Sequence, residues 1–360
     1  QEINDSFTEM WPSTANLKEK ATLQREIRDS MVKLDKDKYD HKWGEFHGTV
    51  IGTPCSDGEA VYVWNSSGVA VRYDLEGNRQ WGSQISSMTK HHGYPSSPLL
   101  IGGKFVVFLK DLVAFDADTG QVAWRNEVLK DDRLYGDHFF ESPAPVEIGG
   151  KPFIYVHRKL IQAWDGKTVW QQNRLDKGNV PTAIVGGGNL IHFNSVGRFF
   201  KAKVPTSSKE PALTDEGKLN LFTDIKTNAR DNLIASPLYH EGLTYVVNYD
   251  GVLFMIDTEK QEVIYTQDLA LDLERRNRLH VYGTVYANPI LTRDAIIVIG
   301  MTGTMVAFMP GREYRELGRN KIEQVSRHWG MPEGFSASPV AEGNRLYIRG
   351  DEYLYCIGKE

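Results

Sequence analysis

A small residue followed by Pro recurs along the chain, and this repeat constrains the fold more than any other feature. The clear copies are Thr53-Pro54, Ser97-Pro98, Ser142-Pro143, Ser236-Pro237, Asn288-Pro289 and Ser338-Pro339, with Val180-Pro181 as a weaker one. Successive prolines lie 44, 45, 38, 56, 52 and 50 residues apart. Each copy begins a series of short apolar runs rich in β-branched and aromatic residues, which indicate strands. A four-stranded unit repeated every 40–50 residues or so is typical of a propeller blade.

The polar turn after the third strand of each unit supports this interpretation. Asp74, Asp116, Asp165 and Asp257 are predicted to end the third strands, where a carboxylate can accept hydrogen bonds from the amides of the turn. Gly77, Gly120 and Gly166 can supply the positive φ that the turn needs. An aromatic residue follows in the fourth strand, at Trp81, Trp124, Trp170 and Tyr265. We expect the tryptophans Trp43, Trp81, Trp124 and Trp170 to pack between blades.

The last unit, from Ser338 onwards, has only three strands, so its fourth strand must come from elsewhere. Residues 40–46 carry Trp43 at the position of a fourth-strand Trp, and pairing them into the last blade removes an open edge. We therefore predict an all-β fold, a seven-bladed β-propeller of four-stranded blades closed by an N-terminal strand in the last blade. The predicted domains are an N-terminal helical extension over 1–39, with the helix at 13–35, and the propeller over 40–360.

Some segments depart from the repeat. The fourth unit has neither the Asp turn nor the Trp, and residues 206–220 after it are predicted to be a polar loop. Residues 268–279 are predicted to form a short helix.

Composition excludes several function classes. The net charge of −5, with no sustained basic stretch, argues against nucleic acid as a partner. No apolar stretch approaches the roughly 20 residues of a membrane helix, so no transmembrane segment is predicted. The start at Gln1 fits a processed mature form and equally a trimmed chain. Cys55 and Cys356 occupy apolar positions of the repeat, and we expect both to be buried and reduced rather than bridged.

The units "SPLLIGGKFVVFLKDLVAFDADTGQVAW" and "SPAPVEIGGKPFIYVHRKLIQAWDGKTVW" resemble the quinoprotein-like (PQQ-like) propeller repeat. The resemblance covers residues 40–360, and the C-terminal "SPVAEGNRLYIRGDEYLYCIG" is similar to the ending of exported bacterial members. It therefore implies a periplasmic or secreted protein. Quinoprotein dehydrogenases of this kind have eight blades, a vicinal Cys-Cys and a calcium or lanthanide ion. The chain has no Cys-Cys and seven units, so the expectation is a propeller without bound PQQ.

Histidines concentrate in the loops that enter the innermost strands. In a propeller these loops share one face with the loops between the second and third strands, which here carry Lys110, Arg158, Arg198 and Asp250. We predict a ligand site on this axial face. Its candidate residues are His47, His92, His138, Arg158, Arg230, His280, Tyr282, His328 and Trp329.

Three interpretations of the histidines stay open. They can satisfy loop backbone, they can line a pocket for a polar or anionic, carbohydrate-like ligand such as a sugar acid, or they can hold a divalent metal. The metal candidates are His47, His92, His138, His280 and His328. No cofactor is predicted, although such a metal remains an alternative.

The predicted function is an exported module that binds a small molecule, a glycan or a protein partner. A polysaccharide lyase is the alternative, because seven-bladed lyases use His, Tyr and Arg near the axis. The catalytic candidates would be His138, Tyr135 and Arg158. A protein-interaction scaffold, like the outer-membrane assembly lipoprotein with similar repeats, is a further alternative.

Overall fold

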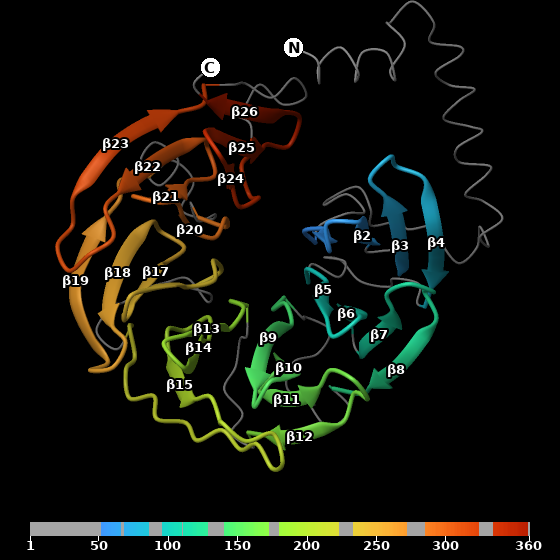
Figure 1. Cartoon of the computed structure of the whole chain (residues 1–360). Coiled ribbons are helices and arrows are strands. Elements are labelled where there is room, and N and C mark those ends of the chain that lie inside the picture. Colours follow the sequence, from blue (N-terminus) through green and yellow to red (C-terminus); the bar gives the residue numbers. More distant parts are fainter. Residues whose placement is uncertain are drawn as a thin grey trace, which may run out of the picture.

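Seven antiparallel sheets surround a common centre in the computed structural model of the chain (Figure 1). The structure describes residues 52–65, 68–85, 96–109, 111–128, 140–172, 180–222, 233–271, 285–323 and 334–358. The predicted all-β, seven-bladed propeller is therefore confirmed. Within these ranges there is no helix. The predicted helix at 13–35, the closing strand at 40–46 and all but the first four residues of the predicted helix at 268–279 lie outside the described residues.

The sheets are numbered as blades in chain order, and each begins with its innermost strand. Blade 1 contains β1 (Cys55–Ser56), β2 (Ala60–Asn65), β3 (Val69–Asp74) and β4 (Arg79–Gln84). Blade 2 contains β5 (Leu99–Ile101), β6 (Lys104–Phe108), β7 (Leu112–Asp116) and β8 (Val122–Asn126). Blade 3 contains β9 (Ala144–Ile148), β10 (Lys151–Val156), β11 (Lys159–Gln162) and β12 (Thr168–Gln171).

Two of the remaining blades have three named strands instead of four. Blade 4 contains β13 (Ile184–Gly186), β14 (Asn189–Phe193) and β15 (Phe199–Lys203), and blade 5 contains β16 (Leu238–His240), β17 (Leu243–Val247), β18 (Val252–Asp257) and β19 (Glu262–Asp268). Blade 6 contains β20 (Ile290–Leu291), β21 (Ile296–Ile299), β22 (Thr304–Phe308) and β23 (Glu316–Lys321). Blade 7 contains β24 (Val340–Glu342), β25 (Arg345–Arg349) and β26 (Leu354–Gly358).

The outer edge of blade 4 is covered by residues 204–222, which we call the outer segment. Its backbone runs antiparallel to β15, because the amide of Phe199 donates to the carbonyl of Leu219 at 3.0 Å and the amide of Glu216 donates to Lys201 at 2.7 Å. Leu213 is buried among apolar residues of blades 3 and 4. Residues 206–219 contain no strand, so the predicted loop is confirmed, and its last part lies along β15 through these backbone hydrogen bonds and the Arg198–Asn220 bridge.

A relay of hydrogen bonds links the heads of the seven blades. In each link, the backbone amide of one residue donates to the side-chain oxygen of its counterpart in the next blade, at 2.7–3.1 Å. The relay runs through Thr53, Ser97, Ser142, Thr182, Ser236, Asn288 and Ser338. The weaker anchor predicted at Val180-Pro181 is thus two residues too early, since Thr182 is the member from blade 4 and is followed by Ala183.

Tryptophans in the fourth strands pack against the next blade and hydrogen bond to it, as predicted. The indole nitrogen of Trp81 donates to the carbonyl of Ala117 in blade 2 at 2.9 Å, and that of Trp124 donates to Ala163 in blade 3 at 3.0 Å. Gly166 has φ of 74°, and a Cβ there would lie 2.5 Å from the Trp124 ring, so only glycine fits beneath the indole. Trp170 is half-buried and packs against Phe200 of blade 4.

The Asp turns are confirmed in three blades and corrected in the fourth. Asp74, Asp116 and Asp257 end β3, β7 and β18, and each accepts a hydrogen bond from a turn amide. Hydrogen bonds from Thr119 hold the pKa of Asp116 below its usual value. In blade 3 the strand ends at Gln162, so the assignment of Asp165 to this position is wrong. Asp165 lies within the turn and accepts from the amide of Lys167.

Both cysteines are free thiols, but their burial differs from the prediction. Cys55 is half-buried, and burial raises the pKa of its thiol to about 12. Cys356 is exposed, so the prediction that it is buried is wrong. It lies on β26, which has no neighbouring strand on its outer side among the described residues, and Leu354 on the same strand is also exposed.

Candidate functional site

Among the candidate ligand residues of the axial face, the structure describes Arg158. His47, His92, His138, Arg230, His280, Tyr282, His328 and Trp329 lie outside the described residues, as does the catalytic candidate Tyr135. Of the charged residues predicted in the loops between second and third strands, Arg198 and Asp250 are described and Lys110 is not. Arg158 and Arg198 line one recess, which makes it the candidate site.

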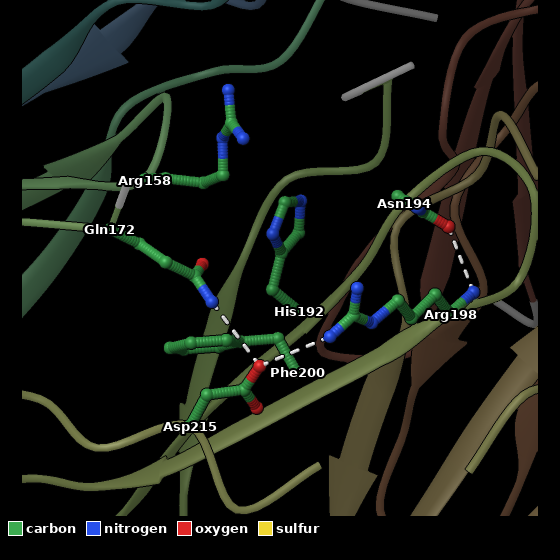
Figure 2. A pocket seen from close by; sticks show the side chains of 7 residues that line it. All are labelled: Arg158, Gln172, His192, Asn194, Arg198, Phe200 and Asp215. Carbon is green, nitrogen blue, oxygen red and sulfur yellow. Dashed lines mark hydrogen bonds and ion pairs between the residues drawn. The ribbon is translucent and has the colours of Figure 1, made fainter. Parts of the chain in front are cut away.

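The recess lies between blades 3 and 4 and measures about 300 Å³, including its part open to solvent. Blade 3 contributes residues from the β10–β11 turn and from the end of β12, blade 4 contributes β14, the β14–β15 turn and β15, and the outer segment contributes a carboxylate (Figure 2). The lining residues are Arg158, Gln172, His192, Asn194, Arg198, Phe200 and Asp215.

An unusual turn places Arg158 at the recess. Val156 pairs with Lys159 across the β10–β11 hairpin, so His157 and Arg158 form a two-residue turn, with φ of 48° and 58°. A hairpin turn with two left-handed residues matches the twist of the strands, but Asn-Gly or Gly-Gly normally occupies it. Non-glycine residues there are strained by about 1 kcal/mol or more each. The surrounding contacts therefore have to hold this turn in place.

Buried contacts on both sides hold the turn. The Nδ1 of His157 lies 3.2 Å from the Oε1 of Glu141, and both side chains are almost fully buried. The ammonium of Lys159 donates to the backbone carbonyl of Val128 in blade 2. Because a buried carboxylate needs a partner, the Glu141–His157 contact fixes the turn and with it the direction of Arg158, whose side chain is 6 % exposed.

Arg198 enters the recess from blade 4. Its own amide donates to the Oδ1 of Asn194 at 2.8 Å, which closes the β14–β15 turn. One guanidinium nitrogen lies 3.6 Å from the Oδ2 of Asp215, and the amide nitrogen of Gln172 donates to the same oxygen at 3.2 Å (Figure 2). Asp215 therefore connects the two blades across the recess.

His192 forms part of the recess as a neutral ring. It is 3 % exposed, and its Nε2 lies 3.1 Å from the carbonyl oxygen of Pro181, which can only accept a hydrogen bond. Burial lowers the pKa of His192, which leaves the imidazole uncharged at neutral pH. The positive charge of the recess therefore comes from its two guanidinium groups.

Tyr155 lies behind the recess, with its ring stacked on Phe200 and edge-on to His192. It is fully buried, and its hydroxyl has no hydrogen-bond partner among the described residues. Burial raises the pKa of this hydroxyl well above its usual value, so it stays a donor. A buried hydroxyl without a partner costs about 1–3 kcal/mol.

Two guanidinium groups, one carboxylate and several neutral hydrogen-bonding groups in the recess suit the binding of an anionic ligand that also carries hydroxyl groups. Guanidinium groups bind carboxylates and phosphates through paired N–H donors. The amides of Gln172 and Asn194 can meet hydroxyl groups of a ligand. Among the residues that the structure describes, no group of three or more His, Cys, Asp or Glu side chains is arranged to hold a metal ion.

Sequence reasoning named both arginines but missed the remaining lining residues. His192 lies in the apolar run "NLIHF", where a single His was a weak sign of a polar contact. Asp215 was hidden in a segment without any repeat pattern, and no signal in the sequence placed it beside Gln172.

Comparisons with known proteins agree with the repeat. The family model described as "Outer membrane protein assembly factor BamB", a PQQ-type model, matches residues 12–142. No curated protein matches the chain. The resemblance to PQQ-like propellers is therefore confirmed at the level of the repeat.

Solved structures show the fold. BamB from Moraxella catarrhalis is 13% identical with a TM-score of 0.60, and the alignment covers 85% of this chain and 84% of that one. The C-terminal WD40 domain of Sif2 is 8% identical with a TM-score of 0.60, over 86% and 81%. A europium-containing methanol dehydrogenase is 13% identical with a TM-score of 0.54, over 82% and 72%. At these identities the likeness concerns the propeller architecture alone.

No helix in the described part of the chain has the length and apolar character needed to cross a membrane.

Proposed function

We propose that this PQQ-like β-propeller is a binding module that holds the acidic group of a polar, carbohydrate-like ligand in the recess between blades 3 and 4. The observation that carries the proposal is the convergence of Arg158 and Arg198 from adjacent blades on one recess. Arginine is the side chain best suited to a planar carboxylate, because its N–H groups form a rigid fork.

The recess suits one group of a larger ligand. The recess is open to solvent, so a ligand that places its acidic group at the arginines keeps its further sugar units outside. Phe200 offers an apolar wall, and the neutral amides offer contacts to hydroxyl groups. The prediction that His47, His92, His138, His280 and His328 surround the axial end of the propeller remains a separate prediction.

A protein partner is the second candidate, favoured by the match of residues 12–142 to the BamB assembly-factor family. A propeller can present loops from all of its blades to another protein. The same match and the resemblance of the repeat motivate the proposal that the chain works outside the cytoplasm, in the periplasm or as a secreted protein. The lyase alternative requires Tyr135 and His138 beside Arg158, and both lie outside the described residues.

Isothermal titration with glucuronate oligomers and with neutral glucose oligomers of equal length tests the proposal. We expect binding of the acidic series, and loss of about 10-fold or more in affinity for Arg158→Gln, because a hydrogen bond to a charged group is removed. Arg125→Gln is the matched control, since Arg125 is exposed on β8, away from the recess. Equal binding of the neutral and acidic series, or an unchanged affinity for Arg158→Gln, would contradict the proposal.

A further inference from the structure

We infer that blade 1 carries a docking site for the indole of Trp43, at the turn that contains Gly77, and that this contact joins blade 7 to blade 1. Trp43 lies outside the described residues, while the docking turn and the surfaces on both sides of the junction are described. The junction lies away from the recess between blades 3 and 4, so this contact is separate from the proposed ligand site.

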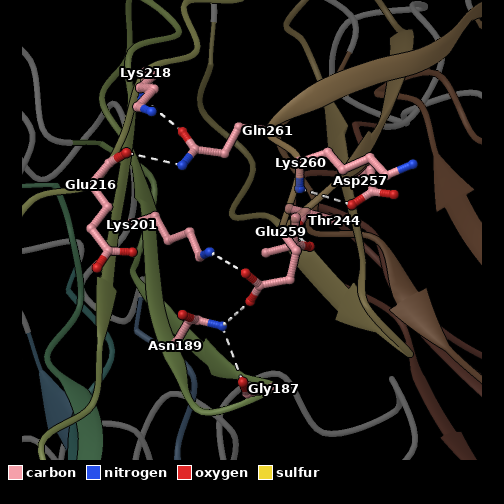
Figure 3. A network of polar contacts seen from close by, with 11 residues as sticks. Gly187, Asn189, Lys201, Glu216, Lys218, Thr244, Asp257, Glu259, Lys260 and Gln261 are labelled. Carbon is pink, nitrogen blue, oxygen red and sulfur yellow. Dashed lines mark hydrogen bonds and ion pairs between the residues drawn. The ribbon is translucent and has the colours of Figure 1, made fainter.

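The other six junctions between consecutive blades are filled by buried side chains. Each of the six apolar clusters among the described residues joins two consecutive blades, from blades 1 and 2 to blades 6 and 7. Blades 4 and 5, which have no tryptophan between them, are also joined by polar contacts (Figure 3). The ammonium of Lys201 donates to Glu259 at 2.8 Å, and the side chain of Gln261 donates to the carbonyl of Glu216 at 2.9 Å. Within the described ranges, blades 7 and 1 share no such cluster.

The relay of hydrogen bonds between blade heads stops at the same junction. The amide of Asn288 in blade 6 donates to Ser338 of blade 7 at 2.9 Å, and the amide of Thr53 in blade 1 donates to Ser97 of blade 2 at 3.0 Å. Ser338 and Thr53 are both described, and no hydrogen bond joins them. Six links therefore connect seven blade heads, and the ring needs a different contact between its last and first blades.

The surfaces on both sides of this junction are apolar and exposed. In blade 7, Leu354 is 70% exposed and Val340 is 56% exposed, whereas Leu112, which begins the third strand of blade 2 as Leu354 does in blade 7, is fully buried towards blade 3. In blade 1, Leu75 is 62% exposed, whereas Ala163, which follows the third strand of blade 3 as Leu75 does in blade 1, is fully buried. Blades 7 and 1 are neighbours in the ring, so these apolar groups border one junction (Figure 1).

Blade 1 also has the turn on which a tryptophan of the preceding blade docks at two other junctions. A Cβ at Gly120 would lie 2.5 Å from the indole of Trp81, and a Cβ at Gly166 would lie 2.5 Å from that of Trp124. Gly77 is the glycine of this turn in blade 1 and has φ of 87°, yet no atom of the described residues lies within 4 Å of a Cβ built there.

Backbone hydrogen bonds show that the three turns are equivalent. In each of them, the amide of the residue that ends the third strand donates to the carbonyl of the residue after the glycine. These acceptors are Asn78 in blade 1, Gln121 in blade 2 and Lys167 in blade 3. Blade 1 therefore presents a complete docking turn on the side of blade 7.

Trp43 has the position in the repeat that this turn requires. In blade 2, Trp124 of the fourth strand lies opposite Ala114 of the third strand. Cys356 takes the place of this alanine in β26, so Trp43 is expected opposite Cys356. From there its indole reaches blade 1 as Trp124 reaches blade 3, and its N–H can donate to the carbonyl of Leu75.

The length of the chain allows this arrangement. Residues 44–54 connect Trp43 to Cys55 in β1 and span up to about 35 Å when extended. The first and fourth strands of a blade are about 14 Å apart, which is three interstrand spacings. A segment of the same chain also has an effective concentration in the millimolar range, which favours it over a second copy or another protein.

The test compares Gly77→Ala with Gly58→Ala in the full chain. Both glycines lie in turns of blade 1, with φ of 87° and 90°, and a Cβ at either has no atom of the described residues within 4 Å, so the backbone strain is matched. If Trp43 covers Gly77, the new methyl group also displaces the indole. Gly77→Ala should then lower the melting temperature at least about twice as much as Gly58→Ala. In a Trp43→Ala background the two substitutions should have equal effects.

A second measurement follows the thiol of Cys356 in a Cys55→Ala background. Cys356 is exposed among the described residues, so a slow reaction with a thiol reagent would report that residues 40–46 cover it. Trp43→Ala should raise the reaction rate at least about 10-fold, because the covering segment then detaches more often. Trp164→Ala is the control, since Trp164 is an exposed tryptophan of blade 3 and should leave the rate unchanged. Trp43→Leu replaces Trp43→Ala in both measurements if that variant does not fold.

Equal losses for Gly77→Ala and Gly58→Ala would overturn the inference, whatever the rate at Cys356. An excess loss for Gly77→Ala that persists in the Trp43→Ala background, or that varies with protein concentration, would assign the docking turn to a partner or to a second copy and would also overturn it. A Cys356 thiol that reacts equally fast with and without Trp43 would contradict the placement of Trp43 opposite β26.

Discussion

The junction between blades 2 and 3 and the junction between blades 3 and 4 use the same repeat but differ in their interiors. At the first, Trp124 covers Gly166, donates to Ala163 and joins a continuous apolar cluster. At the second, Trp170 is only half-buried, and an apolar cluster is followed by a recess lined with charged and polar groups.

The lower burial of Trp170 follows from what blade 4 lacks. Its third strand, β15, continues into the outer segment without the Asp turn and glycine on which a tryptophan of the preceding blade could dock. The recess lies at the other end of β15, beside the β10–β11 and β14–β15 turns that carry Arg158 and Arg198. Blade 4 therefore lacks the docking turn at one end of β15 and lines the candidate binding site at the other.

The largest expected effect is at the packed junction. Trp124→Ala should lower the free energy of unfolding by about 3–5 kcal/mol, because it removes a large buried ring and its hydrogen bond to Ala163. Trp164→Ala is the matched control, since Trp164 is 40% exposed and should cost about 1 kcal/mol or less. Chemical denaturation measures the free energy of unfolding of both variants. Equal losses would show that the contacts of Trp124 with blade 3 contribute little to stability.

The second effect concerns the turn that carries Arg158. Glu141→Ala should destabilise the protein by about 1–3 kcal/mol, because it leaves His157 buried without its carboxylate. It should also weaken binding of an acidic ligand, since the strained turn positions Arg158. Glu147→Ala on the exposed side of β9 is the control. Full stability and full affinity in Glu141→Ala would show that the turn does not depend on this contact.

The third effect tests whether blade 4 is tied to its neighbours at the centre as firmly as the other blades. Thr182→Val removes the side-chain oxygen that accepts from the amide of Ser142, and should cost about 1 kcal/mol. Ser142→Ala removes the equivalent link to Ser97 and should cost a similar amount. A negligible loss for Thr182→Val beside a clear loss for Ser142→Ala would show that blade 4 is less firmly attached at the centre.

The smallest effect is a pH dependence from His192. Its folded-state pKa is lowered by burial, so the unfolded chain takes up a proton first as the pH falls below about 6.5. The stability from the neutral ring is therefore present above that pH and is lost below it. His192→Gln should flatten the decline in urea stability between about pH 7.5 and 5.5 relative to the unaltered protein. Parallel curves would mean that His192 titrates normally.

Much of the fold could be read from particular residues because the signals are local. The relay residues Ser97, Ser142, Ser236 and Ser338 stand beside prolines that mark the heads of the blades. Trp81 and Trp124 follow Asp74 and Asp116 by seven and eight residues, so their packing between blades followed from their place in the repeat. Two predictions were wrong because a residue of the repeat pattern does not occupy its usual position. Thr182 provides the relay hydroxyl in blade 4 but is not followed by proline, and Asp165 lies within the turn instead of at the end of the strand.

The sequence by itself determined the number of blades, their order and the identity of the residues that repeat in them, because strand periodicity and turn chemistry act over a few residues. Tertiary structure alone decided that Asp215 lies against Gln172 and Arg198, 43 and 17 residues away in the chain. The outer segment has no periodicity, and its course is set by side-chain contacts to three blades at once. The charge and shape of the recess depend on that course, which no local pattern encodes.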